Sequence, residues 1–279
     1  KLMINKKVVF CIPVRNESSN LKSLFKTLDK LNLKFEDYFI IFVESDSSDN
    51  SSDLIKKYLE RRKGVLINKN LKGIENRVMR LAISRNEYLN FIKNDQSLKT
   101  YDLMIVLDCG GVNGSLTAKK IKNAILENEN SIGIFPTQKF LYYDIWTLRI
   151  DNIINYDCFE ELFKSYKKNS KIRKIFFNLI GKFLFINFII KTKKINVISA
   201  YGGMGIYKLN KVIDFTYDSN NGKNCEHVEF NKQIYKKYGN CLVLDKNLTN
   251  SFGINIHTIN ILLCSASNYF ANRFIKKII

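Results

Sequence analysis

Hydrophobic positions in the first half of the chain follow two alternating patterns. Short runs of apolar, β-branched residues are typical of strands buried on both faces, and they occupy residues 8–14, 38–44, 65–68 and 102–108. Apolar residues at helical spacing fill the intervals and predict helices over residues 21–31, 53–62 and 75–93. This alternation predicts an α/β fold with a mostly parallel central sheet flanked by helices.

The second half has a less regular pattern. We expect a helix over 115–126, a strand over 131–136, a strand over 196–207 broken at Gly202 and Gly203, a helix over 226–238, and strands over 242–245 and 252–257. The chain has 279 residues, only two prolines and no Gly/Ser-rich linker. We therefore predict a single domain.

The formal net charge of +19 allows an anionic partner or a surface covered with lysines. Lysine is scattered along nearly the whole sequence, so charge alone identifies no partner. Six cysteines show no CxxC pair, and several lie in apolar runs where a free thiol behaves as a small hydrophobe. With no signal peptide recognised, these thiols favour a reducing, cytoplasmic location.

Membrane contact is a separate question. No uncharged apolar run reaches the length of a membrane span. Residues 175–190 form an apolar segment with basic residues at both ends. Such a segment fits a helix lying on an anionic membrane surface, and it fits equally a buried element near an acceptor groove.

Polar loops follow three of the predicted strands, at Arg15–Glu17, Glu44–Asp49 and Asp108–Asn113. In open α/β sheets, ligands bind outside the carboxyl ends of the strands. Asp108 could reach a divalent cation there, while Gly110 and Gly111 let the backbone approach a diphosphate. The alternative is that Asp108 simply caps the next turn.

This order of segments resembles the GT-A glycosyltransferases. Pro13–Glu17 resembles their opening strand and turn, Glu44–Ser51 their base- and ribose-binding loop, and Asp108 the start of their DxD motif. The string Asn76–Asn86 is most similar to the capsule-type (CAP59-like) mannosyltransferases. The resemblance implies a GT-A fold in which residues 1–115 bind a UDP- or GDP-linked sugar and residues 116–279 bind the acceptor.

The resemblance also implies a donor site and a metal. The donor-binding candidates are Pro13, Arg15, Glu17, Glu44, Asp46, Arg77, Arg80, Arg85, Asp108, Gly110 and Gly111. On a helix, Arg77 and Arg80 can present two guanidinium groups to phosphate, or form salt bridges to the acidic loop. Gly110 stands where the family has a second Asp, which weakens the expected Mn²⁺ or Mg²⁺ site. Asp108 and the late His257 are its candidate ligands.

The acceptor side rests on two segments. Gly202 and Gly203, followed by Glu226, resemble the glycine pair and acidic helix start of the family's acceptor region. Glu226 is the first candidate for the base that takes the acceptor's proton, with His227 beside it. Trp146 can stack on a sugar ring, and the nearby Asp144 is an alternative base. A dipole-suited helix start and a buried aromatic cluster would give the same patterns.

Sugar transfer to a glycan or lipid-linked acceptor is the function that these segments predict. A nucleotidyltransferase of related fold would carry a glycine-rich loop after the first strand, and residues 14–19 contain no glycine. A nucleic-acid-binding protein would cluster basic and aromatic residues, and the acidic loop at 44–53 would repel a phosphate backbone. Nucleic acid is therefore not an expected partner.

Overall fold

The computed structural model describes residues 3–157, 187–190 and 194–251. His257, the predicted strand over 252–257 and most of the apolar segment 175–190 lie outside these ranges. The predicted membrane-surface helix and the predicted histidine ligand therefore stay predictions.

Strands and helices alternate through the first half as expected. In chain order the elements are β1 (Ile4–Val14), α1 (Ser18–Asn32), β2 (Phe35–Glu44), α2 (Ser51–Leu59), β3 (Gly64–Asn68), α3 (Arg77–Asn94), the short 3-10 helix η1 (Leu98–Thr100), β4 (Leu103–Leu107) and α4 (Ala118–Glu127). The second half adds β5 (Gly133–Gln138), β6 (Ile195–Asn196), β7 (Met204–Lys208), α7 (Leu209–Val212), α8 (Glu226–Tyr238) and β8 (Leu242–Ser251).

Within the described residues, one eight-stranded sheet joins these strands in the order β3-β2-β1-β4-β7-β5-β8-β6. The four strands of the first half are all parallel. Strand β7 runs antiparallel to both β4 and β5, and the short β6 runs antiparallel to β8. The sheet is thus mixed but mostly parallel, which confirms the predicted fold class.

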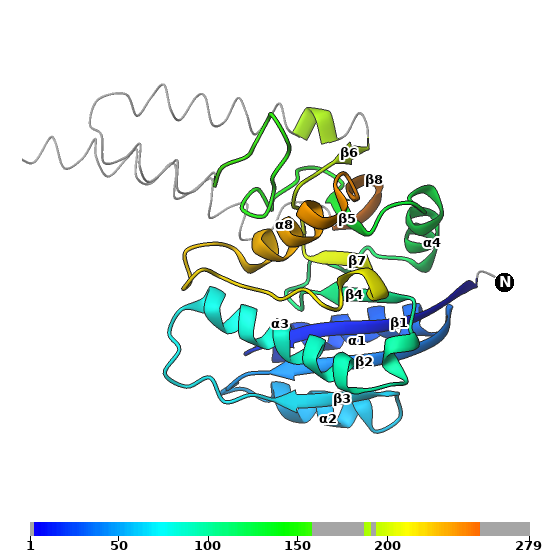
Figure 1. Cartoon of the computed structure of the whole chain (residues 1–279). Helices are drawn as coiled ribbons and strands as arrows, with labels where there is room; N and C mark the ends of the chain where they lie inside the picture. The colour runs from blue at the N-terminus through cyan, green and yellow to red at the C-terminus, as the bar shows by residue number, and fades with distance from the viewer. Residues whose placement is uncertain (1–2, 158–186, 191–193, 252–279) are drawn as a thin grey trace, which may run out of the picture.

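Helices cover both faces of the sheet (Figure 1). Helices α3, α7 and α8 pack on one face, where Val9, Met104 and Phe230 belong to one buried cluster. Helices α1, α2 and α4 pack on the other face with Val8, Phe10 and Ile105. Alternate residues of β1 enter opposite clusters because strand side chains alternate between faces, so β1 is the two-sided central strand that its apolar run predicts.

Two expected elements differ from the structure. The predicted strand over 196–207 forms only at its two ends, in β6 and β7. The break expected at Gly202 and Gly203 is present, where the backbone adopts φ values of +66° and +85°. The predicted strand over 242–245 continues to Ser251, as its partner β5 follows it with two register shifts. Polar residues in this extension hid it from a search for apolar runs.

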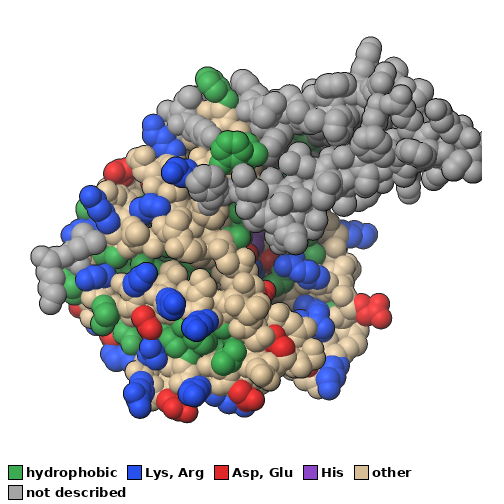
Figure 2. Space-filling model, turned by 180° about the vertical axis from the view of Figure 1, so that it is seen from behind, with side chains coloured by type: hydrophobic (Ala, Val, Ile, Leu, Met, Phe, Trp, Pro, Cys, Tyr) green, Lys and Arg blue, Asp and Glu red, His purple; other side chains and the backbone are tan. Residues whose placement is uncertain are grey.

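Lysine and arginine side chains are spread over the face shown in Figure 2 rather than gathered in one patch. This distribution matches the lysine-covered surface that the sequence allowed. Among the described residues, no helix is both long and apolar enough to span a membrane. The described cysteines Cys11, Cys109, Cys225 and Cys241 are all free thiols and buried.

Candidate active site

The loops after β1, β2 and β4 meet at one edge of the sheet, because parallel strands end on the same side. The turn that precedes β7 also lies here, since β7 pairs antiparallel with β4. Its Gly203 carbonyl accepts the Asp108 N–H at 3.0 Å. Asp108 and the glycine pair at Gly202, 94 positions apart in the sequence, are thereby brought together.

Asp108 follows the last residue of β4 and presents a partly exposed carboxylate, with 41% of the side chain open to solvent. Its Oδ1 accepts hydrogen bonds from Arg85 Nη2 at 3.1 Å and from the Tyr201 hydroxyl at 3.0 Å. Burial, and then the charge of Asp108, raise the pKa of Tyr201 well above its usual range. Tyr201 therefore stays protonated and donates to Asp108.

Arg85 lies on α3 with its side chain only 2% exposed. Besides Asp108, its guanidinium donates from Nε to Glu226 Oε1 at 3.1 Å, and the Glu226 side chain is 3% exposed. Arg85 also lies over the Tyr201 ring, with its Cζ 5.2 Å from the ring centroid. Arg85, a donor-binding candidate from the sequence, is therefore a buried cation shared by two carboxylates.

His227 follows Glu226 at the start of α8 and is stacked on Tyr201, with ring centroids 3.5 Å apart. Burial, with Arg85 adding to it, lowers the pKa of His227 well below its usual range. Neither ring nitrogen has a hydrogen-bond partner among the described residues. His227 is thus a neutral imidazole packed beneath the tyrosine that holds Asp108.

Asp144 lies in the loop after β5 and faces the glycine turn. Its Oδ2 accepts the Gly202 N–H at 2.8 Å. Burial raises the pKa of Asp144 to about 6, although the bonds from Gly202 and Thr147 oppose the shift and the charge of Asp108 adds to it. A carboxylate with such a pKa is ionised at neutral pH and still a useful proton acceptor.

A buried amide network fixes the glycine turn. Asn250 Nδ2 donates to the Gly202 carbonyl at 2.8 Å and to Asn113 Oδ1 at 3.0 Å. Asn113 Nδ2 in turn donates to the carbonyls of Asp108 and Gly203, both at 3.0 Å. Gln138 completes the network by donating to Asn250 Oδ1 at 3.0 Å. The loop after β4 and strands β5 and β8 thus all hold the turn beside Asp108.

Replacing Gly203 by Ala is expected to destabilise the fold by about 2 kcal/mol or more. A Cβ there would lie 2.5 Å from Val112 Cγ2 and 2.9 Å from the Tyr143 hydroxyl, on a backbone with φ of +85°. Gly110→Ala is the matched control, because a Cβ at Gly110 meets nothing within 4 Å. Denaturant unfolding checks this, and equal midpoints for both variants would contradict the packing argument.

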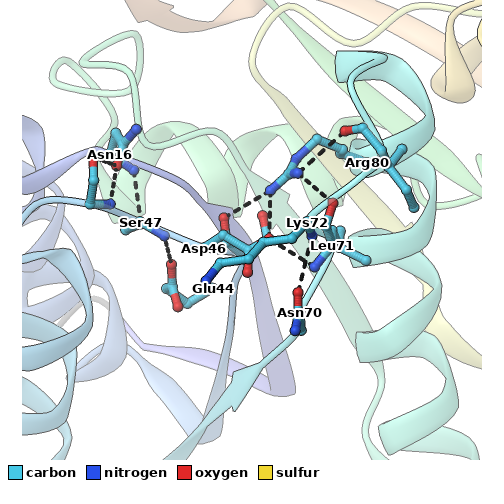
Figure 3. Close-up of polar contacts among 11 residues, drawn as sticks. Asn16, Glu44, Asp46, Ser47, Asn70, Leu71, Lys72 and Arg80 are labelled. Carbon is cyan, nitrogen blue, oxygen red and sulfur yellow. Dashed lines mark hydrogen bonds and ion pairs between the residues drawn. The ribbon is translucent and has the colours of Figure 1, made fainter.

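Arg80 joins two loops on the donor side (Figure 3). Its Nη2 donates to the Ser45 carbonyl at 3.1 Å and to Asp46 Oδ2 at 3.0 Å, and its Nη1 donates to the Leu71 carbonyl at 2.7 Å. Asp46 also accepts the Leu71 N–H at 2.8 Å. Of the two roles that the sequence allowed for Arg80, the structure shows the salt bridge to the acidic loop.

A second set of contacts ties the β1 loop to the β2 loop (Figure 3). The Asn16 N–H donates to Ser47 Oγ at 2.9 Å, and the Ser48 N–H donates to Asn16 Oδ1 at 2.7 Å. Glu44 is buried and accepts the Ser47 N–H at 2.6 Å. Much of the acidic loop is therefore used to hold its own shape.

Arg80→Lys is expected to lower the melting temperature by about 5 °C, as one ammonium cannot satisfy the same carbonyls and carboxylate. Because both donor loops would loosen, the KM for a nucleotide sugar should rise about tenfold with little change in kcat. Arg62→Lys is the control, since Arg62 pairs with Asp29 on α1, away from this edge. Unchanged donor KM in Arg80→Lys would remove its positioning role.

Other predicted residues have simpler surroundings. Four of them are exposed, namely Arg15, Arg77, Gly110 and Gly111. Within the described ranges, neither Arg15 nor Arg77 forms an ion pair. Pro13 is buried in β1, and Glu17 accepts from Asn20 Nδ2 at 2.7 Å. Trp146 is partly buried, with its Nε1 donating to Asp157 at 3.0 Å.

The expected metal was tested against the donor atoms present. In the described part of the chain, no group of three or more His, Cys, Asp or Glu side chains is placed to hold a metal ion. Asp108 already gives Oδ1 to Arg85 and Tyr201. The described residues therefore do not form a metal site by themselves.

Sequence reasoning assigned no role to four residues of this site. Tyr201 lies next to the glycine pair, and its hydroxyl is the second donor to Asp108. Asn113, Gln138 and Asn250 form the buried amide network. Three separate amides carry no recognisable spacing in the sequence. The position of Tyr201 beside Gly202 was the one available signal.

Comparison with known proteins decides which family the first half resembles. Residues 9–108 match the model of Glycosyl transferase family 2. The match runs from Val9, within β1, to Asp108, so this part of the chain is similar to glycosyltransferases as expected. It gives no support to the capsule-type likeness in particular. A search of curated proteins finds no match.

Two solved structures are similar to the whole chain. The mannosyltransferase PcManGT from Pyrobaculum calidifontis, in complex with GDP-Man and Mn²⁺, has a TM-score of 0.55 at 11% identity, over 99% of this chain and 65% of that one. TarS from S. aureus has a TM-score of 0.51 at 13% identity, over 89% of this chain and 37% of that one. The chain thus spans less than two thirds of either structure. These similarities show the GT-A fold.

Proposed function

We propose that the chain is a glycosyltransferase that moves a sugar from a nucleoside-diphosphate sugar to a hydroxyl acceptor. The observation that carries this proposal is the half-exposed Asp108 carboxylate at the end of β4, where the β1 and β2 loops converge. These three segments all lie in the part of the chain that matches the family 2 model. The same match favours sugar transfer over a nucleotidyltransferase or a nucleic-acid-binding protein.

The donor fits the edge formed by the β1, β2 and β4 loops. Glu44 and Asp46 shape the pocket for the nucleoside, because their carboxylates fix the backbone of the β2 loop. Exposed Arg15 and Arg77 supply positive charge for the diphosphate, and Gly110 and Gly111 let the backbone approach it. GDP-mannose, which PcManGT binds, and UDP-sugars are the first donors to test.

The acceptor fits the glycine-turn side. Its hydroxyl oxygen attacks the anomeric carbon as the bond from that carbon to the diphosphate oxygen breaks, and a base takes the hydroxyl proton. We assign this role to Asp144, since its pKa of about 6 suits a base and it lies at the Gly202 turn. Glu226, the first candidate from sequence, instead neutralises buried Arg85. Trp146 is proposed to stack on the acceptor sugar.

Mn²⁺ or Mg²⁺ bound with the donor would offset the charge that develops on the diphosphate. Asp108 is the described residue that we propose contacts it, and His257 stays the predicted second ligand. The capsule-type likeness of residues 76–86 makes a mannosyl donor and a polysaccharide acceptor specific cases of the proposal. A lipid-linked acceptor would agree with the proposed peripheral membrane contact of the basic, apolar segment 175–190.

The proposal is tested by incubating the full chain with GDP-mannose and a panel of UDP-sugars, with and without Mn²⁺. Release of nucleoside diphosphate, accelerated by a glycan or lipid-linked acceptor, is the expected result. Conversion of a nucleoside triphosphate and sugar phosphate into pyrophosphate would instead identify a nucleotidyltransferase. No release from any donor would contradict the proposed activity.

A further inference from the structure

Arg85 connects two carboxylates that belong to different parts of the site. Asp108 ends β4 in the donor half, whereas Glu226 starts α8 in the acceptor half. Both carboxylates bind the same guanidinium at 3.1 Å, through Nη2 and Nε respectively. We propose that Arg85 is a positioning residue that couples the Asp108 carboxylate energetically to Glu226, and through it to α8.

The burial of Arg85 and Glu226 is the reason to expect this coupling. Arg85 and Glu226 are almost completely buried, so neither charge has bulk water as an alternative partner. Asp108 is partly exposed and open to whatever enters the donor pocket. When a positively charged group approaches Asp108, the interaction between Asp108 and Arg85 weakens. Glu226 must then neutralise more of the buried positive charge of Arg85.

The surrounding side chains keep Arg85 in this bridging position. Tyr201 and Tyr217 flank the guanidinium, with its Cζ 5.2 and 5.8 Å from their ring centroids. His227 stacks on Tyr201 and meets the Tyr217 ring edge-on at 5.5 Å. Because these aromatic rings leave Arg85 little freedom, the guanidinium stays between the two carboxylates. A change in the interaction of one carboxylate with Arg85 therefore alters the interaction of the other.

The guanidinium of Arg85 does not have all of its hydrogen-bond donors paired. Its third nitrogen, Nη1, is buried and has no hydrogen-bond partner among the described residues. An incompletely satisfied buried cation depends strongly on the two carboxylates that it does bind. Losing one is tolerable while the other remains, but losing both leaves a buried charge without a counter-ion.

A double-mutant cycle measures this coupling without any ligand. Asp108→Asn, Glu226→Gln and the double variant are compared with the unmodified chain by thermal unfolding. The double variant is expected to melt at least about 5 °C below the value that the two single shifts add up to. Additive shifts would overturn the proposal.

In an Arg85→Met background, the single substitutions should shift the melting temperature in the opposite direction. Without the cation, the two carboxylates repel each other, so neutralising either one should raise the melting temperature of Arg85→Met. If Arg85→Met does not fold, Arg85→Lys serves in its place. An ammonium lacks the fork that spans both acceptors, so the coupling should fall to less than half. Coupling that persists unchanged would show that Arg85 does not carry it.

The functional consequence rests on the proposed glycosyltransferase activity. Glu226→Gln should change the Kd of UDP or GDP at least threefold, and this change should disappear in the Asp108→Asn background. A merely structural Glu226 would leave nucleotide affinity unchanged, which would overturn transmission to the donor site. If neither nucleotide binds the unmodified chain, the proposed function fails, whereas the unfolding cycle still decides whether Arg85 couples the two carboxylates.

Discussion

Asp108→Asn is expected to reduce sugar transfer at least about 100-fold, the size of effect seen when a charge-stabilising group is removed from an active site. The amide keeps an oxygen that can accept from Arg85 and Tyr201, so the local packing is preserved. What disappears is the negative charge at the end of β4. Affinity for the nucleotide sugar should fall as well, because the carboxylate is the proposed contact to the donor's cation.

Steady-state kinetics on the full chain measure this effect, with Arg62→Lys as the comparison. Arg62 binds both carboxylate oxygens of Asp29 at 2.7 and 2.9 Å, outside the candidate site. That variant should match the unmodified chain in kcat and KM. Turnover of Asp108→Asn within about threefold of normal would show that the edge after β4 is not where the donor binds.

Asp144→Asn should reduce kcat at least about 100-fold while nucleotide affinity stays within a factor of two. The asparagine oxygen can still accept the Gly202 N–H, so the glycine turn remains anchored. An amide cannot take up the acceptor's proton, and this is the loss that the measurement detects. Glu226→Gln, by comparison, should reduce kcat less than Asp144→Asn does.

The pH dependence of kcat tests the role of Asp144 independently. Burial raises the pKa of Asp144 to about 6, and only its ionised form can act as a base. The kcat should therefore rise with pH through about 6 and level off above 7. In Asp144→Asn this limb should be absent from the residual activity. If the same rise of kcat with pH persists in Asp144→Asn, another group titrates there and Asp144 is not the base.

Much of the fold could be predicted from the sequence because apolar patterns report burial directly. The helix over 226–238 is matched to the residue by α8, and the run at 8–14 lies within β1. The extension of β8 escaped prediction, and β6 was expected only as the start of a longer strand, since two-residue or polar strands owe their form to partners distant in sequence.

The candidate site was predictable in its parts but not in its pairings. Loop position at a strand end identified Asp108, and resemblance to the family's acceptor region identified the glycine pair. The roles of Arg80 and Arg85 could not be told apart from spacing on one helix. Only the fold shows that Arg80 clamps the donor loops whereas Arg85 is buried between Asp108 and Glu226.

Direct binding of a nucleoside diphosphate tests the central claim most simply. Calorimetric titration of the full chain with UDP and with GDP, in the presence of Mn²⁺, should give a saturable Kd for at least one of them. Under the same conditions the Asp108→Asn variant should bind that nucleotide at least tenfold more weakly. Equal binding to both proteins, or no binding of either nucleotide to the unmodified chain, would contradict a nucleotide-sugar site at the end of β4.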